Sequence, residues 1–515
     1  MNYKILKRAR ILLSLVFLVT ITAAFIFFVS RETSLFSLFL KIQFVPSLLG
    51  IFSGGALVFV LLMLMTLLFG RVYCSTLCPL GVFQDIVSNF TNRFRSKKNR
   101  KYSFKRANNS IRYTILAITG VSLIAGITLP LVYLDPYSNW GKISNEIISR
   151  SEQLIHNGLS DIFPQTIFYR SYAFFALGSF LFALLFMLIV IIFSAFRGRL
   201  YCNTICPVGA FLGLTSKLSL FKPVIDKSKC NRCSLCVTKC KSECIDLETR
   251  TIDESRCVAC FNCMQVCSKS GISYKFTFKS KNDKTQEGEK RESDIESGER
   301  RRALIAMGLM GTALAAKAIN LGPVFKSAPK ITGIAPPGAL SIEHLKKNCT
   351  ACHACIAACP NNIIHPASGE YGIDGILLPV LSFNHHFCSF ECNECSKVCP
   401  NDALKPLSIE DKQLAQIGEA QFYLEKCIVH TDGTDCGACD EHCPTKAITM
   451  VPYGDTALYI PSLNTELCIG CGGCEYICPA IPDKAMVIHA LAVHGRAERP
   501  TLDKQEKIKV DDFGF

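Results

Sequence analysis

The chain reads GRVYCSTLCPLG at residues 70–81 and GRLYCNTICPVG at residues 198–209. Both stretches follow the pattern G-R-x-Y-C-x3-C-P-x-G, and each comes directly after a long apolar stretch. Three residues between two cysteines place both thiols on one face of a helical turn. The repetition predicts a duplicated unit of two apolar helices followed by a pair of thiols, which are Cys74 and Cys78 in one copy and Cys202 and Cys206 in the other.

A helix needs about 20 apolar residues to cross the hydrocarbon core of a bilayer. Four stretches of the chain meet that requirement, and they cover residues 10–30, 47–69, 113–134 and 172–196. A shorter apolar segment at 35–46 contains Lys41 and ends at Pro46, so we expect it to lie at the membrane interface. The apolar content of 49% agrees with a multi-pass membrane protein.

Basic residues gather at one end of the predicted spans. They occupy the N-terminus (MNYKILKRAR), the connection at 91–112 and the segment that begins with RGR at 197. Loops rich in Lys and Arg stay on the cytoplasmic side, so the acidic loop 135–171 is expected outside. Topology thereby accounts for the net charge of +14, and nucleic-acid binding is not expected. The four spans contain no His, so we predict that they carry no haem b.

A first group of eight cysteines follows the second copy of the repeat. It has the spacing C-x2-C-x2-C-x3-C twice, as in a bacterial two-cluster ferredoxin, where the fourth Cys of each run binds the other cluster. Zinc favours two separated C-x2-C pairs, so we predict two 4Fe-4S clusters. The ligands of one are Cys230, Cys233, Cys236 and Cys267, and those of the other are Cys257, Cys260, Cys263 and Cys240. Cys244 is left over, and we predict a buried structural thiol.

Four more cysteine runs lie between residues 345 and 480, and all end in C-x2-C-x3-C-P. They predict four further clusters, about six in total, with iron bound by Cys349, Cys352, Cys355, Cys359, Cys388, Cys392, Cys395, Cys399, Cys427, Cys436, Cys439, Cys443, Cys468, Cys471, Cys474 and Cys478. The sequence leaves open whether neighbouring runs exchange fourth ligands or pair in a nested order. Longer first gaps make Cys388 and Cys427 the least regular ligands. The first run also contains the c-type haem signal C-x-x-C-H at 349–353, but its further cysteines favour a cluster.

Residues 279–299 separate the two cysteine-rich regions. They are charged and almost without apolar side chains, so they cannot bury a core and are predicted to be a linker. Three arginines, Arg300 to Arg302, then precede the run ALIAMGLMGTALAA. A twin arginine before a short apolar run is typical of a Tat export signal, and the alternative is a basic linker with a short core helix. We predict that 300–318 is a signal or a fifth short anchor, and that the C-terminal half is exported.

A chain of 515 residues is too long for one simple core, and these motifs divide it. We predict an α-helical membrane domain with four spans plus two α+β ferredoxin-like 4Fe-4S domains. The expected units are the membrane domain at 1–215, a cytoplasmic two-cluster ferredoxin at 216–278, the linker at 279–299, the signal or anchor at 300–318, and a periplasmic four-cluster ferredoxin at 335–495.

The duplicated motif with the ferredoxin run at 230–267 makes residues 1–275 resemble the NapH family. The twin arginine with four cysteine runs makes residues 298–490 resemble the NapG/MauM family. The resemblance implies a protein of the bacterial inner membrane that oxidises quinol and passes electrons to a periplasmic reductase or cytochrome c. Nitrate reductase is the named case. Here both parts share one polypeptide, a departure from the usual two subunits that puts the specific reductase in doubt.

The role of the four thiols in the repeat stays open at this level. They are either redox-active groups near a quinol site or reduced thiols that close two helix ends. The chain as a whole is expected to be an electron-transfer component of a quinol dehydrogenase. A redox sensor, a maturation factor for a periplasmic reductase and a purely structural anchor are the alternatives. With no haem ligands in the spans, the route of electrons across the membrane is unexplained.

Overall fold

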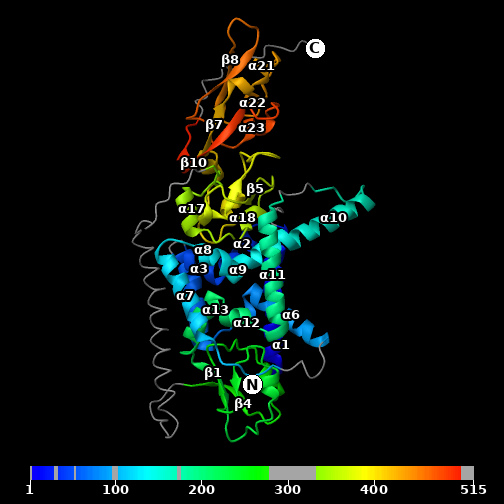
Figure 1. The fold of residues 1–515 in the computed structure, drawn as a ribbon, viewed down its shortest axis with the longest axis vertical. Coiled ribbons are helices and arrows are strands. Elements are labelled where there is room, and N and C mark those ends of the chain that lie inside the picture. The colour runs from blue at the N-terminus through cyan, green and yellow to red at the C-terminus, as the bar shows by residue number, and fades with distance from the viewer. Residues whose placement is uncertain are drawn as a thin grey trace, which may run out of the picture.

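The computed structural model describes residues 3–27, 33–51, 54–94, 102–170, 175–277 and 332–499. The molecule is elongated, with a helical domain in its middle (Figure 1). The unit that contains β1 and β4 lies at one end of this domain, beside the N-terminus. The unit that contains β5 to β10 extends from the opposite end. The predicted linker 279–299 and the predicted signal 300–318 lie outside the described residues.

The helical domain is built from short and long helices. They are α1 (Tyr3–Phe27), α2 (Thr33–Lys41), α3 (Phe44–Leu49), α4 (Gly55–Phe69), α5 (Tyr73–Thr76), α6 (Pro79–Phe94), α7 (Asn109–Ile124), α8 (Leu129–Leu134), α9 (Pro136–Ile143), the π-helix η2 (Ser144–Ser149), α10 (Arg150–Ile162), α11 (Leu177–Arg197), α12 (Leu200–Thr204) and α13 (Pro207–Ser216). Among the described residues, α1 and α11 are the helices long and apolar enough to cross a membrane by length and composition.

Two of the four predicted spans are therefore not single long helices. The stretch 47–69 is divided between α3 and α4, because Gly54 has a φ of 99° and the backbone turns there. An added Cβ on Gly55 would lie 2.7 Å from the carbonyl oxygen of Gly50, so the turn brings the backbone close to itself. The stretch 113–134 is divided at Gly126, which has a φ of 73°, between α7 and α8.

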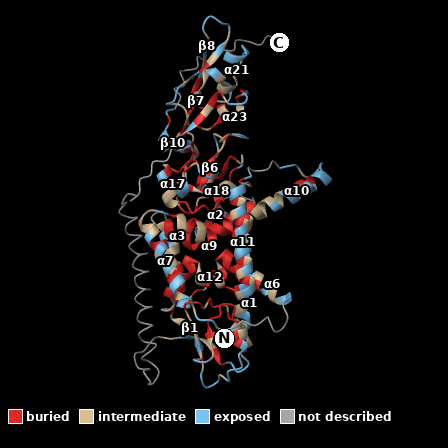
Figure 2. Ribbon diagram, in the orientation of Figure 1, coloured by how far each residue is buried: buried red, intermediate tan, exposed pale blue. Residues whose placement is uncertain are grey.

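The helices of the helical domain, including the short ones, pack around a common buried core. Buried residues fill its interior, while exposed residues lie along the outer faces of α1, α7 and α11 (Figure 2). Leu12 of α1 and Leu185 of α11 are 67% and 60% exposed, so large apolar side chains cover this outer surface. The segment 35–46 was expected to lie at the membrane interface. Its last residues, Gln43 to Pro46, are instead buried in the core of the helical domain.

The ferredoxin-type units at the two ends consist of short strands and single helical turns. The first contains α14 (Leu235–Thr238), α15 (Asn262–Val266) and the antiparallel pairs β1 (Phe221–Ile225) with β4 (Ile272–Phe276) and β2 (Ile245–Asp246) with β3 (Thr251–Ile252). The second contains the antiparallel pairs β5 (Ile364–Pro366) with β6 (Pro379–Leu381), β7 (Ala415–Phe422) with β10 (Met486–Arg496), and β8 (Ile448–Pro452) with β9 (Tyr459–Leu463). Its helices are α17 (Ile342–Asn348), α18 (Ala354–Ala357), α19 (Glu394–Lys397), α20 (Ile409–Lys412), α21 (Ile428–Thr431), α22 (Ala438–Glu441) and α23 (Gly473–Ile477).

The second unit is joined to the helical domain by buried contacts. One hydrophobic core contains Trp140 of α9 together with the first C-terminal cysteines. The hydroxyl of Thr128 contacts the carbonyl oxygen of Cys349 at 3.0 Å, and the hydroxyl of Ser138 contacts that of Thr350 at 2.8 Å. An added Cβ on Gly141 would lie 2.2 Å from the carbonyl oxygen of Cys352. The first C-terminal cysteine run therefore belongs to the packing of the helical domain.

Replacing Gly141 by Ala should loosen this junction, because the new methyl group overlaps backbone of the second unit and the ring of Phe25. Overpacking of this kind costs about 1–3 kcal/mol. We expect faster hydrogen exchange at residues 346–353 in the variant. The matched control is Gly158→Ala on α10, where an added Cβ has open space. Equal exchange in both variants would contradict the contact.

Candidate metal centres

The first eight predicted ligands fall into two separate cavities. Cys230, Cys233, Cys236 and Cys267 line one, and Cys257, Cys260, Cys263 and Cys240 line the other. These are the two sets that the crossed ligation pattern predicts. Cys244 is buried, as expected for the leftover thiol, and its Sγ lies 3.5 Å from that of Cys240.

Thiols of neighbouring C-terminal runs lie beside each other, on a question that the sequence left open. The thiols near that of Cys355 are those of Cys349, Cys352 and Cys399, followed by Cys395. The thiol of Cys395 interacts with those of Cys388, Cys392 and Cys359. One cavity is lined by Cys427, Cys436, Cys439 and Cys478. The thiol of Cys474 interacts with those of Cys471, Cys468 and Cys443.

Four of the six runs share an unusual backbone conformation. The residues on either side of the second Cys have positive φ in each of them, and these residues are Arg232 and Ser234, Ala259 and Phe261, Ala351 and His353, and Gly470 and Gly472. A positive φ is costly for a residue other than Gly. The chain adopts it here because the loop curls around a cavity that the thiols of the run line, as in the two sets of the first unit. This geometry fits a compact iron–sulfur cube.

Backbone amides point at several of the sulfur atoms that cross between runs. The N–H of Gly271 donates to Cys267 Sγ at 3.2 Å, and that of Leu404 donates to Cys399 Sγ at 3.4 Å. Ala447 and Ala485 do the same for Cys443 and Cys478, at 3.2 and 3.4 Å. Such donors stabilise negative charge on a sulfur and tune the potential of a bound cluster. These four crossing thiols thus have a donor that would stabilise the thiolate form of a ligand.

Within the described ranges, no three His, Cys, Asp or Glu side chains lie close enough to hold a single metal ion. A cube differs from one ion because each thiolate binds a different iron atom, so its ligands stand further apart. When bound, iron–sulfur clusters supply one-electron transfer.

Family comparisons agree with the last of these sets, because a model described as a 4Fe-4S dicluster domain matches residues 434–481. A model described as a 4Fe-4S binding domain matches residues 53–99 and 179–226, which contain the four cysteines of the duplicated motif. No solved structure matches the chain significantly. The cysteine geometry and the two models define an iron–sulfur protein of the ferredoxin type.

Curated relatives narrow this class. The ferredoxin-type protein NapF of Escherichia coli K12 is 32% identical over 160 residues, which cover 87% of NapF and 31% of this chain. NapG of the same strain is 30% identical over 194 residues, which cover 80% of NapG and 35% of this chain. The methylamine utilization protein MauM of Methylobacillus flagellatus is 28% identical over 159 residues, or 67% of MauM and 30% of this chain. The chain belongs to the family of ferredoxin-type proteins that contains NapF and NapG. The expected similarity to NapG and MauM is confirmed, while the expected fusion to NapH stays a prediction.

The four thiols of the duplicated motif lie in the interior of the helical domain. Cys74, Cys78, Cys202 and Cys206 are only 3–4% exposed. The sequence left open whether they are redox-active groups near a quinol site or reduced thiols that close two helix ends, and this stays a prediction. The structure packs them in the same core as the first C-terminal cysteines.

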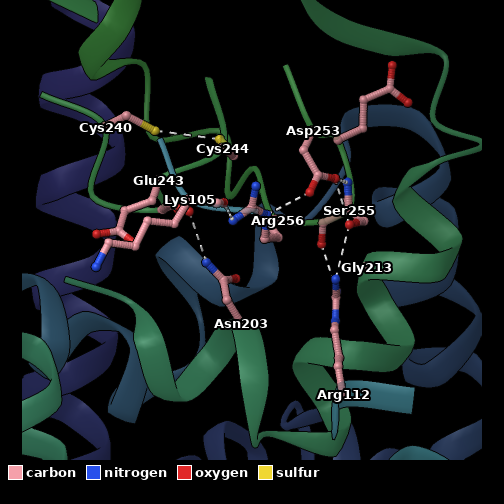
Figure 3. Close-up of polar contacts among 12 residues, drawn as sticks. Lys105, Arg112, Asn203, Gly213, Cys240, Glu243, Cys244, Asp253, Ser255 and Arg256 are labelled. Carbon is pink, nitrogen blue, oxygen red and sulfur yellow. Dashed lines mark hydrogen bonds and ion pairs between the residues drawn. The ribbon is translucent and has the colours of Figure 1, made fainter. Parts of the chain in front are cut away.

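Sequence reasoning missed the charged contacts that join the first ferredoxin unit to the helical domain. Arg112 donates through Nη2 to the carbonyl oxygen of Ser255 at 2.8 Å (Figure 3), and Arg71 donates through Nη1 to the same oxygen at 2.9 Å. Asp85 of α6 pairs with Lys241 of the first unit. The available signal was the Arg that follows Gly in each copy of the motif.

Neighbour pairing predicts a specific pattern of iron loss. Cys399→Ser should remove one cluster, or about four irons per chain. Adding Cys352→Ser should remove no more, because both thiols belong to one set, whereas adding Cys395→Ser should remove about four further irons. Iron and sulfide analysis of anaerobically purified protein measures this.

The matched control is Cys244→Ser, which we expect to keep all its iron. A loss of about eight irons from the Cys399/Cys352 double variant would contradict neighbour pairing.

Proposed function

We propose that this chain oxidises membrane quinol and passes the electrons through its iron–sulfur clusters to a periplasmic reductase or cytochrome c. The first part would act as a NapH-type quinol dehydrogenase and the last part as a NapG-type polyferredoxin. The observation that carries the proposal is the arrangement of the cysteine sets at both ends of a helical domain with an apolar outer surface.

The sets at each end follow one another closely. In the first unit, the thiol of Cys263 interacts with that of Cys236 in the other set. In the second unit, Cys355 interacts with Cys395, and the N–H of Cys388 donates to the carbonyl oxygen of Cys471 at 2.9 Å. The set of Cys474 then neighbours that of Cys439. Each unit thus supports a series of one-electron steps.

The charge distribution supports opposite locations for the two units. The basic N-terminal segment contacts the first unit, because Lys7 donates to Gln265 at 2.7 Å and the N–H of Tyr274 donates to the hydroxyl of Tyr3. Basic segments stay in the cytoplasm, which favours a cytoplasmic first unit. The second unit lies at the other end of the helical domain (Figure 1), and this favours the periplasm.

A cavity of about 340 Å³ offers a quinol site beside the first unit. Its volume lies within the range of small-molecule sites. Ile11 and Leu15 of α1 and Ile86 of α6 provide apolar walls, while Lys241 and Asn262 bring it next to the set of Cys240 and Cys263. A quinol head would sit at the polar end, with its tail along α1 and α6 towards lipid.

Oxidation of one quinol to quinone releases two electrons and two protons. The electrons would leave one at a time to the set of Cys240, Cys257, Cys260 and Cys263. Asp85 lines the cavity, but it is not the proton acceptor. Burial would raise its pKa, yet Arg199 and Lys241 lower the pKa of Asp85 below its usual range. The protons would therefore pass to water at this end of the molecule.

Filling the cavity tests this function. Leu15→Trp should slow reduction of the clusters by the quinol analogue duroquinol by roughly tenfold, equivalent to about 1.4 kcal/mol, because the indole occupies the space of the quinol head. The control is Leu12→Trp, which points outward from the same helix. Iron content should stay unchanged in both, and stopped-flow absorbance measures the rate.

Equal rates in the two variants would contradict this quinol site. A wild-type protein that duroquinol does not reduce at all would contradict quinol oxidation and favour the sensor or maturation role.

A further inference from the structure

The duplicated motif brings two thiols from each copy together in the middle of the helical domain. The surroundings of Cys206 include Cys202, Cys78 and Cys74, and those of Cys78 include Cys202 and Cys74. All four are buried. Equivalent residues of the two copies are 128 positions apart in the chain, as for Cys74 and Cys202, so packing of the duplicated halves creates this set.

The two copies of the motif are joined by reciprocal hydrogen bonds, in which the Arg of each copy donates to a cysteine carbonyl oxygen of the other. Arg71 of the first copy donates through Nη2 to the carbonyl oxygen of Cys202 in the second, at 3.1 Å. Arg199 of the second copy donates through Nη1 to the carbonyl oxygen of Cys74 in the first. The last Gly of each motif makes room for this, because an added Cβ would lie 2.3 Å (Gly81) or 2.2 Å (Gly209) from a cysteine carbonyl oxygen. The Arg and the last Gly of each motif thus hold the backbone at Cys74 and Cys202 in position.

Positive charge surrounds the thiols without matching negative charge. Arg71 is fully buried, and its partners besides the motif cysteines are the neutral oxygens of Asn203 and Ser255, both at 2.9 Å. Among the described residues, no carboxylate forms an ion pair with it. Asp85 alone is shared by Arg10, Arg199 and Lys241. A buried charge is costly unless an opposite charge compensates it.

An iron–sulfur cube held by four thiolates is negatively charged and would provide that compensation, whereas neutral thiols or disulfides would not. Hydrogen-bond donors already point at the sulfur atoms. Gln84 Nε2 donates to Cys202 Sγ at 3.1 Å, and the N–H of Gly209 donates to Cys206 Sγ at 3.3 Å. Donors to the sulfurs are a usual means of tuning a cluster.

We propose that Cys74, Cys78, Cys202 and Cys206 bind one further 4Fe-4S cluster, shared between the two copies of the motif. Each copy supplies only two thiols, so neither could bind the cube alone. In this proposal the four thiols bind iron, whereas the sequence left them as either redox-active groups near a quinol site or reduced thiols that close two helix ends.

This cluster would lie between the two ferredoxin units. On one side, Arg71 contacts Ser255, two residues before Cys257. On the other side, the hydroxyl of Tyr201 donates to the carbonyl oxygen of Leu134 at 2.8 Å. Leu134 immediately precedes Asp135, whose carboxylate contacts Ser138, the residue that meets Thr350 of the second unit. Packed groups thus connect the thiol set to the units on both sides.

The cluster would accept one electron from the reduced set of Cys240, Cys257, Cys260 and Cys263, which is thereby oxidised. It would then pass that electron to the set of Cys349, Cys352, Cys355 and Cys399, with no bond formed or broken. This step provides the missing route across the membrane. The electron path rests on the proposed function, whereas the presence of iron does not.

Iron analysis of the full-length wild-type chain, purified without oxygen, is the first test. Seven cubes predict about 28 irons per chain, and six predict about 24. The double variant Cys74→Ser/Cys202→Ser should lose about four irons and one cluster signal in Mössbauer and EPR spectra. The control Cys244→Ser should lose none. About 24 irons in the wild type, zinc in this set, or disulfides found by thiol labelling would overturn the proposal.

The double variant also separates this proposal from the proposed function. With duroquinol, its cytoplasmic clusters should be reduced while the four C-terminal clusters stay oxidised. Loss of four irons from a chain that duroquinol never reduces would support the cluster and contradict quinol oxidation. Unchanged iron with normal reduction of all clusters would support quinol oxidation and contradict the added cluster.

Discussion

Thiols that close around a compact inorganic cube force the backbone beside them to curl, and the structure depends on this constraint. Ala351 and His353 take positive φ for this reason, as do Arg232 and Ser234 in the first unit. Left-handed backbone in such residues is costly, so it persists only where the surrounding contacts hold it. The short strands and single helical turns of both ferredoxin units provide those contacts.

The helical domain packs cysteines together in an apolar interior. At three places a glycine allows a helix backbone to approach the carbonyl oxygen of a cysteine closely. Gly81, Gly209 and Gly141 each pack against the carbonyl oxygen of a cysteine, and an added Cβ would overlap that oxygen. The first two order the thiols of the repeat, and the third holds the C-terminal unit on the domain. Backbone contact at the cysteines therefore links the helical domain to the ferredoxin chemistry.

Buried arginines form the junction between the first ferredoxin unit and the helical domain. Arg71, Arg112 and Arg199 are among the largest fully buried side chains of the described protein, and they lie where the first ferredoxin unit meets the helical domain. Arg71 and Arg112 donate mainly to backbone carbonyl oxygens, which orient a guanidinium but do not neutralise it, whereas Arg199 pairs with Asp85. A junction of this kind favours negatively charged clusters on both of its sides.

The spacing of the cysteines was enough to identify the ferredoxin units, because ligands to a cube must come from close positions in the chain. The same spacing gave the crossed sets around Cys240 and Cys267. Spans were harder to predict, since hydropathy reports composition and does not show that Gly54 and Gly126 end helices early. The sequence also showed that the C-x3-C-P motif occurs twice. Only the tertiary structure brings Cys74 and Cys202 into one core and places thiols of neighbouring C-terminal runs beside each other, because both depend on contacts between segments that are distant in the chain.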